Sequence, residues 1–161
     1  MTTYSFLDVQ VAVNGPGGAF VIDPTSGFDT FSLGPGSGNA EEGITVEMSE
    51  DKDTMTLGAD GTLMHSLHAA IAGRITIRLL KTSPTNGFLS QLYNTQTVSA
   101  AFHGQNTISI QDKARGDTIT GSQMAFMRFP NVVYAKEGNI MEWAFGGLIN
   151  QQLGSGTVLN P

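Results

Sequence analysis

The sequence of 161 residues contains no cysteine, no long apolar run and no secretory signal pattern. The lack of cysteine excludes disulfides, thiolate zinc sites and cysteine nucleophiles. Apolar runs stay far below the roughly 20 residues that span a bilayer, and the first ten residues lack both a basic start and an apolar core. We therefore expect a soluble single domain over 1–161, without membrane insertion or a cleaved signal, that folds without a metal.

Charge is sparse and unevenly distributed. Only 14% of the residues are Asp, Glu, Lys or Arg, and the formal net charge is −6. Residues 1–60 hold ten acidic residues and one base, Lys52, whereas residues 61–161 hold seven bases and four acids. Sparse charge favours a surface covered by neighbours, and an acidic patch can meet a basic patch on the next copy. The net negative charge argues against a nucleic-acid binder, which needs a basic stripe.

Alternation of apolar and polar side chains predicts that most of the chain is β-strand. The first strand carries Leu7, Val9, Val11 and Val13 on one face and ends at the turn sequence NGPGG. Residues 23–39 show little periodicity and are expected to form a loop excursion. Further strands are expected at 19–22, 74–80, 98–102, 107–111, 118–129 and 139–152.

Residues 41–58 are predicted to form a hairpin with an acidic tip. Two alternating runs, 44–48 and 54–57, flank the charged sequence SEDKD at 49–53. The segment 63–72 that follows fits either a short helix or an irregular arm.

One helix is predicted, over residues 83–95. Ser83 can cap it, and Pro84 suits the first helical position. Its apolar side chains, at helical spacing, are Phe88, Leu89, Leu92 and Tyr93. Many short strands and one helix predict a mainly β (α+β) fold, an antiparallel β-sandwich or barrel with one flanking α-helix.

Two groups of residues could bind a metal. His65 and His68, with His103 as a third ligand, give the number of imidazoles that a catalytic zinc site needs, but no acidic residue lies nearby in sequence to orient them. Three acids, Asp51, Asp53 and Asp60, resemble a calcium loop that lacks a further oxygen ligand at Met55. A solvated or partner-facing acidic segment explains these acids better, and we expect no metal site and no cofactor.

No catalytic signature is present in the sequence. The glycine-rich segment 34–38 is not followed by the Lys-Ser/Thr pair of a phosphate-binding loop, and no G-x-S-x-G elbow occurs. The tripeptide at 115–117, Arg-Gly-Asp, is better explained by a turn between two strands than by adhesion. We therefore expect no enzyme activity.

Four ordered segments carry a resemblance to a known family. They are AEEGITVEMSEDKDTMTLGADGTLMHSLHA (40–69), GRITIRLLKTSPTNGFLSQLYNTQ (73–96), NTISIQDKARGDTITGSQMAFMRFP (106–130) and YAKEGNIMEWAFGGLI (134–149). Together with NGPGG (14–18), they resemble the tail tube proteins of contractile-tailed bacteriophages, a family of phage structural proteins. Segments 23–39 and 150–161 match less clearly.

This resemblance implies a tail-tube-like subunit that forms hexameric rings, stacked into the inner tail tube. Such a tube is a passive conduit for DNA ejection inside a contractile sheath. The implied partners are further copies of the chain and the tail sheath, tape measure, baseplate and tail terminator proteins, while DNA passes without specific binding. The implied location is the virion tail, after assembly in the host cytoplasm.

Several charged residues are candidates for assembly contacts. Glu47 and Thr45 alternate with the apolar residues of their strand and are expected to face the lumen, because a neutral or acidic wall lets DNA slide whereas a basic wall would grip it. The acids expected to contact an adjacent subunit or ring are Glu41, Glu42, Glu50, Asp51 and Asp53. Lys113 and Arg115 are expected to form a basic turn that receives an acidic patch of a neighbour.

Two alternative functions follow from the same residues. A β-sandwich binding module, such as a virion decoration or adhesin domain, would expose an aromatic-lined pocket instead of self-complementary edges. A metal hydrolase would be built on His65, His68 and His103.

Overall fold

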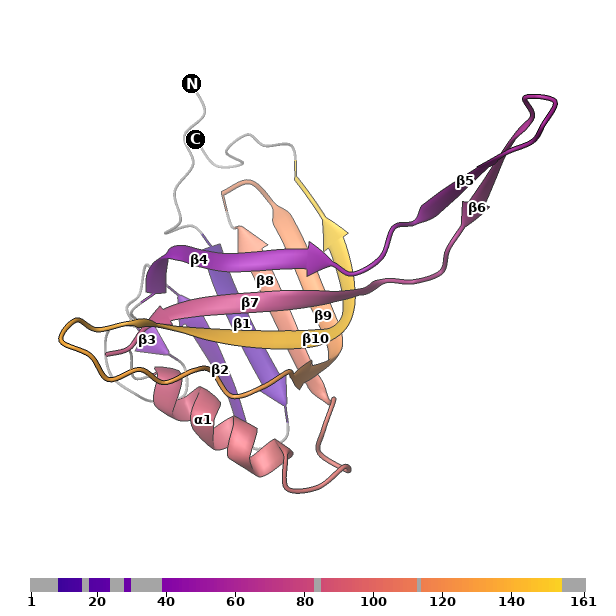
Figure 1. Ribbon diagram of the computed structural model, residues 1–161. Helices are drawn as coiled ribbons and strands as arrows, with labels where there is room; N and C mark the ends of the chain where they lie inside the picture. The colour runs from indigo at the N-terminus through magenta and orange to yellow at the C-terminus, as the bar shows by residue number, and fades with distance from the viewer. Residues whose placement is uncertain are drawn as a thin grey trace.

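The structure, a computed structural model, describes residues 9–15, 18–23, 28–29, 39–82, 85–112 and 114–154. Strands dominate this part of the chain, and one helix interrupts them (Figure 1). The strands are β1 (Val9–Gly15), β2 (Gly18–Asp23), β3 (Phe28–Asp29), β4 (Asn39–Met48), β5 (Asp53–Leu57), β6 (Leu63–Leu67), β7 (Ala72–Leu80), β8 (Asn106–Asp112), β9 (Asp117–Phe126) and β10 (Ile140–Gln152). The helix is α1 (Thr85–Gln96). It falls short of the length and apolarity that a membrane-crossing helix would need, and it is the one helix among the described residues.

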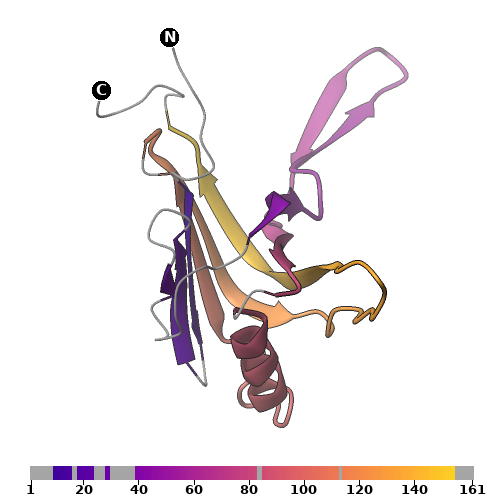
Figure 2. The same cartoon turned by 90° about the vertical axis from the view of Figure 1, so that its left-hand side faces the viewer.

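Eight strands form one antiparallel sheet in the order β3-β2-β1-β8-β9-β10-β7-β4. The sheet curls over, so that β4, β7 and the first half of β10 form a front layer that crosses the strands behind it (Figures 1 and 2). The predicted mainly β fold, with antiparallel strands and one flanking helix, is confirmed. The predicted reversal at NGPGG is confirmed as well, since Gly15 of β1 pairs with Gly18 of β2.

The core lies between the two parts of the curled sheet. Apolar side chains alternate along each strand with polar ones and point into this space. The front layer contributes Ile75, Ile77, Leu79, Met141, Trp143 and Phe145, and the strands behind it contribute Val11, Val13, Ile108, Ile110, Met124 and Phe126. The opposite side chains of the front layer therefore face outward.

A bulge in β9 accommodates the curl. Between the pairs Ala125–Gly146 and Ser122–Leu148, β9 has one residue more than β10. Gln123 in this bulge has a φ of 52°, which is uncommon for a residue other than glycine. Because a bulge bends a strand and increases its twist, it lets β9 and β10 turn from the rear strands into the front layer.

The helix α1 covers one side of the curled sheet (Figure 2). Leu89 and Leu92 pack into the core, and Tyr93 makes an edge contact with Phe126, with ring centroids 5.5 Å apart. The indole of Trp143 donates a hydrogen bond of 2.9 Å to Asn86 in the first turn of the helix. The helix predicted over 83–95 is confirmed at 85–96, and its proposed cap at residues 83 and 84 lies outside the described residues.

The predicted hairpin over 41–58 is wrong. β4 pairs instead with β7, where Ile44 lies opposite Ile77 and Val46 opposite Ile75. Pairing with the distant β7 packs the apolar faces of β4 and β7 into one core. A local hairpin would leave the apolar face of β4 exposed to water. The second half of the predicted hairpin is β5, which pairs with β6, so the segment 63–72 begins as a strand and not as a helix.

The strand predicted over 98–102 is also wrong. Residues 97–104 form turns after the helix, held by side-chain hydrogen bonds. The Thr97 hydroxyl donates to the Tyr93 carbonyl at 2.8 Å, and the Ala101 amide donates to the Ser99 hydroxyl at 3.2 Å. Such local bonds compete with a strand ladder and explain why the β-branched residues here are not extended.

Candidate functional site

The outer face of the front layer carries both acids and arginines. Arg78 on β7 donates to Glu142 on β10 at 3.2 Å and to the Thr45 hydroxyl on β4 at 2.6 Å. Glu47 lies directly opposite Arg74 in the pairing of β4 with β7. Glu47 and Thr45 are exposed, as their alternation predicted. Opposite charges on neighbouring strands stabilise such a face, and Glu47 and Glu142 offset the charges of Arg74 and Arg78.

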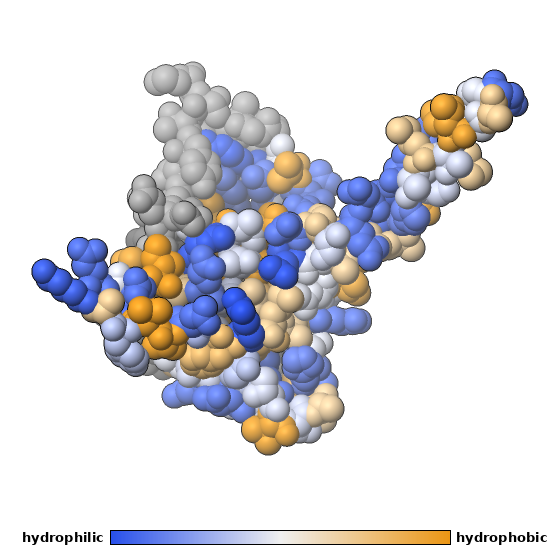
Figure 3. Space-filling view, viewed as in Figure 1, coloured by the Kyte–Doolittle hydropathy of each residue, from blue (hydrophilic) through white to orange (hydrophobic). Residues whose placement is uncertain are grey.

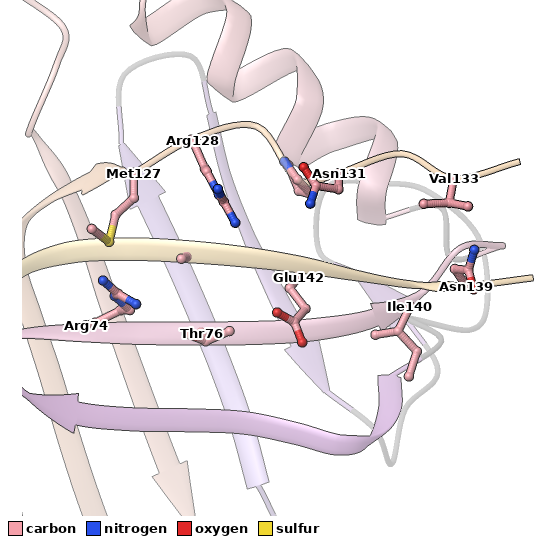
Figure 4. A pocket seen from close by; sticks show the side chains of 11 residues that line it. Arg74, Thr76, Met127, Arg128, Asn131, Val133, Asn139, Ile140 and Glu142 are labelled. Atoms are coloured by element: carbon pink, nitrogen blue, oxygen red, sulfur yellow. The ribbon is translucent and has the colours of Figure 1, made fainter.

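A groove of about 520 Å³ runs along the outer face of β10 (Figure 4). One wall is β7, with Arg74, and the other is the loop over residues 127–139, from which Arg128 points toward β10 (Figure 4). We call this the β10 groove. It is lined by Arg74, Thr76, Met127, Arg128, Val133, Ile140 and Glu142, among others. The groove combines two guanidinium groups with apolar side chains.

Contacts at both ends hold the loop over 127–139 beside the sheet. The Met127 amide donates to the Ala144 carbonyl of β10 at 3.0 Å. At the far end, the Lys81 ammonium donates to the Val133 carbonyl at 2.5 Å and lies 3.6 Å from the centre of the Tyr134 ring. Lys81, next to the end of β7, therefore holds the loop that forms one wall of the β10 groove. No residue spacing in the sequence predicted this groove.

β5 and β6 form an arm that projects far from the sheet (Figures 1 and 2). Leu57 pairs with Leu63, and Met55 pairs with His65, so these four side chains share one face of the arm. Leu67, opposite Asp53, extends the same face. The large apolar side chains of this face, Met55, Leu57, Leu63 and Leu67, are between 50% and 85% exposed.

The tip of the arm is the turn at residues 58–62, which carries Asp60. The Gly58 amide donates to the Thr62 carbonyl at 2.7 Å, and the Thr62 amide donates to the Asp60 carboxylate at 3.0 Å. Hydrogen bonds from the Thr62 amide and hydroxyl lower the pKa of the Asp60 carboxyl from its usual value of 3.8. The tip therefore presents a charged carboxylate beside Leu57 and Leu63.

The acids predicted at a hairpin tip lie at the base of the arm. Glu50 and Asp51 are exposed where β4 leaves the sheet, and Asp53 begins β5. The correction follows from the strand pairing, because the distal turn of the arm is 58–62 and not 49–53. Glu41 and Glu42 lie in β4, and their side chains are outside the described part of the structure.

The structure does not assemble the three predicted histidine ligands. On the arm, His65 pairs with Asp53 at 2.8 Å, and His68 bonds the Thr54 hydroxyl at 2.6 Å. His103 lies in the turns between α1 and β8, at the other end of the molecule from the arm (Figure 1). Among the described residues, no three His, Asp or Glu side chains are grouped so that they could hold a metal ion.

The predicted basic turn is only partly described, because Lys113 lies outside the described residues. Arg115 is buried, and its guanidinium lies 3.5 Å from the buried Asp112 carboxylate of the same chain. The Arg115 amide also donates to Asp112, at 3.2 Å. Arg115 therefore fixes its own turn and does not form the exposed patch that the sequence suggested.

The sequence matches one known protein family over most of its length. Residues 1–154 match the family described as bacteriophage PhiTE tail tube protein. The chain belongs to this tail tube family. Its role is therefore structural, as a component of a phage tail tube. No curated protein sequence matches the chain.

Solved structures share the fold of this tail tube family member at low sequence identity. A chain of the extracellular contractile injection system PVC, in its sheath-tube complex in the extended state, has 11% identity and a TM-score of 0.57 over 94% of this chain and 92% of that chain. A chain of the anti-feeding prophage cap, which terminates the tube, has 10% identity and a TM-score of 0.52 over 96% and 93%. These likenesses show a common fold.

Proposed function

We propose that the chain forms hexameric rings that stack into the inner tail tube, a passive conduit for DNA ejection inside a contractile sheath. Family membership supports the tube, and the observation that carries the conduit is the charge-balanced outer face of the front layer. In this proposal the face with Thr45 and Glu47 lines the bore.

The balance of charge on this face suits a conduit. Duplex DNA carries about one negative charge per 1.7 Å of its axis, so unopposed arginines would hold it. Glu47 and Glu142 stand beside Arg74 and Arg78 on the same face and offset them. A wall in which Arg74 and Arg78 each have an acidic neighbour on the next strand allows DNA to slide, and an acidic wall alone is not needed.

Strand β4 supplies an edge for joining subunits. It is the last strand of the eight-stranded sheet, so one side of its backbone has no partner strand in the described structure. Pairing with a neighbouring copy would satisfy these groups and continue the sheet around a ring. Glu41 and Glu42 in β4, and Glu50, Asp51 and Asp53 at the base of the arm, would then lie at the contact between copies.

The partners proposed for the tube are the tail sheath, tape measure, baseplate and tail terminator proteins. The likeness to chains of a sheath-tube complex and of a tube-terminating cap supports the sheath and a terminating protein. Three further proposals rest on the family relationship: a tape measure protein as a partner, passage of DNA through the tube, and assembly in the host cytoplasm.

Negative-stain electron microscopy of the purified protein across a concentration series tests this function. Hollow rings or striated tubes with sixfold symmetry in end views are the expected result. Particles that stay monomeric, both alone and after baseplate components are added as an initiator, would refute the tube and favour a β-sandwich binding module.

A further inference from the structure

The outer face of the rear strands differs from that of the front layer, because it is polar and uncharged. Ile108 and Ile110 of β8 and Ile119 of β9 pack into the core or against it, so the side chains between them point outward. Among the described residues of β1, β8, β9 and the second half of β10, none of the outward side chains is Asp, Glu, Lys or Arg. We call this surface the polar rear face and define it by Ser109, Gln111, Thr118, Thr120, Asn150 and Gln152.

Strand pairing arranges the polar rear face in two rows. Ser109 lies opposite Thr120, which in turn lies opposite Asn150. The second row, two residues along each strand, consists of Gln111, Thr118 and Gln152. Side chains opposite each other on antiparallel strands are neighbours, so the two rows form a continuous layer. Every side chain of this layer can both donate and accept a hydrogen bond, and none can form an ion pair.

The polar rear face points away from the surface that we propose for the bore. In Figure 2 the rear strands lie on the left, and the front layer with its arm lies on the right, with the core between them. The front layer bears charged residues of both signs, and Figure 3, which views this layer from outside, shows strongly hydrophilic side chains across it. In a tube whose front layers line the bore, the polar rear face therefore belongs to the outer wall.

An outer wall of this chemistry suits a partner that binds and is later released. Surfaces that only face water usually carry Lys, Glu, Asp and Arg, which the polar rear face lacks. A neutral hydroxyl or amide exchanges its hydrogen bonds with water for bonds with a partner at a small net gain. A charge taken out of water needs an opposite charge beside it, and separating the two in a dry interface is costly. Many weak neutral contacts therefore hold a partner and still let it leave.

We propose that the polar rear face is the surface on which the contractile sheath seats, through hydrogen bonds between neutral side chains and without ion pairs. The inference rests on the proposed function, in which a sheath surrounds the tube. It adds the surface and the chemistry of that contact. Such a contact holds the sheath over a wide range of salt concentrations and releases it without leaving an unpaired charge.

Charge variants test the contact by co-sedimentation of tubes with the sheath protein of the same particle. Q111K/N150K adds two charges at exposed positions of the polar rear face, and Q91K/N94K adds the same two charges on the exposed side of α1. We expect only Q111K/N150K to lower sheath binding, roughly tenfold, because its ammonium groups lose water in the contact without gaining a partner charge. Q111S/N150S keeps neutral hydrogen-bonding groups and should bind the sheath as wild-type tubes do.

Salt and cysteine labelling test the chemistry and the place of the contact. Raising the salt from about 0.1 M to 1 M screens exposed ion pairs, so we expect sheath binding to wild-type tubes to change less than about twofold. The chain has no cysteine, so Q111C and T45C each supply a single thiol, one on the polar rear face and one on the face assigned to the bore. Bound sheath should cover the Q111C thiol and slow its labelling by a maleimide at least about fivefold, while T45C labelling stays unchanged.

Each result decides one proposal. Wild-type protein that forms no tubes refutes the proposed function. When tubes form, the sheath contact alone is overturned by no sheath binding to wild-type tubes, by equal binding to Q111K/N150K and Q91K/N94K tubes, by release of the sheath at high salt, or by unchanged labelling of Q111C. If Q111K/N150K alone fails to form tubes, the labelling of Q111C decides the contact.

Discussion

Gly147 shows how a single residue permits the curl of the sheet. A Cβ atom at this position would lie 2.5 Å from the Met124 sulfur and 2.8 Å from the carbonyl oxygens of Ser122 and Gln123. Backbone oxygens in a bulge cannot move aside cheaply, so we expect G147A to lower the free energy of unfolding by about 1–3 kcal/mol. G138A is the control, because a Cβ there meets nothing within 4 Å. Equal urea midpoints for the two variants would contradict this account.

A buried pair of amides joins the end of α1 to the start of β8. Gln96 donates to Asn106 and accepts from it, both at 2.7 Å, and both side chains are almost fully buried. Q96L would leave the Asn106 amide without this partner in the core, and we expect a cost of about 1–3 kcal/mol in urea unfolding. N94L on the exposed side of α1 should cost far less. A Q96L protein as stable as N94L would show that the pair is dispensable.

At the scale of elements, local patterns predicted what local forces determine. The period-two runs of β1, β7 and β8, the turn at NGPGG and the helix were all predictable, because each depends on neighbouring residues. The partner strand of β4 was not predictable, because Ile44 and Val46 would pack against the apolar face of any strand. Only the complete core determines that this strand is β7. The candidate site could not be predicted for the same reason. The alternation placed Glu47 on an exposed face, but only the pairing of β4 with β7 brings it beside Arg74, and no local pattern predicts the β10 groove.

The unpaired edge of β4 makes a prediction about amide exchange. About half of the β4 amides point away from β7 and have no partner strand in the described structure, so they should exchange fast with solvent in the monomer. If copies join through this edge, these amides become protected in assembled tubes. Hydrogen exchange with mass spectrometry measures this change, and β7, paired on both sides, is the internal control. Unchanged exchange in β4 on assembly would exclude an edge-to-edge contact.

The turn at the arm tip should respond to pH through Asp60. Because hydrogen bonds from Thr62 lower the pKa of this carboxyl, their stabilising effect is present above the usual value of 3.8 and is lost as pH falls through the lowered pKa. The Thr62 amide resonance should therefore titrate with a midpoint below 3.8 in NMR spectra. D60N should abolish this titration and leave the amide hydrogen-bonded. A midpoint at or above 3.8 would contradict the hydrogen bonds seen here.

At the scale of the whole molecule, the charge balance of the outer face should set how DNA moves in the tube. The variant E47Q/E142Q removes both acids beside Arg74 and Arg78, whereas Q91K/N94K adds the same charge on the exposed side of α1. If the outer face lines the bore, only E47Q/E142Q tubes should retain short duplex DNA within the bore, and raising the salt should release it.

The two variants distinguish DNA that is held by the outer face of the front layer from DNA that is attracted by the net charge of the tube. Both change the net charge of a subunit equally, so a long-range effect of charge would make both bind DNA alike. DNA retained by Q91K/N94K tubes and not by E47Q/E142Q tubes would contradict the assignment of the front layer to the bore. Retention by E47Q/E142Q alone would mean that the acids of this face keep its arginines from holding DNA, so that the conduit works by local neutralisation of a mixed wall.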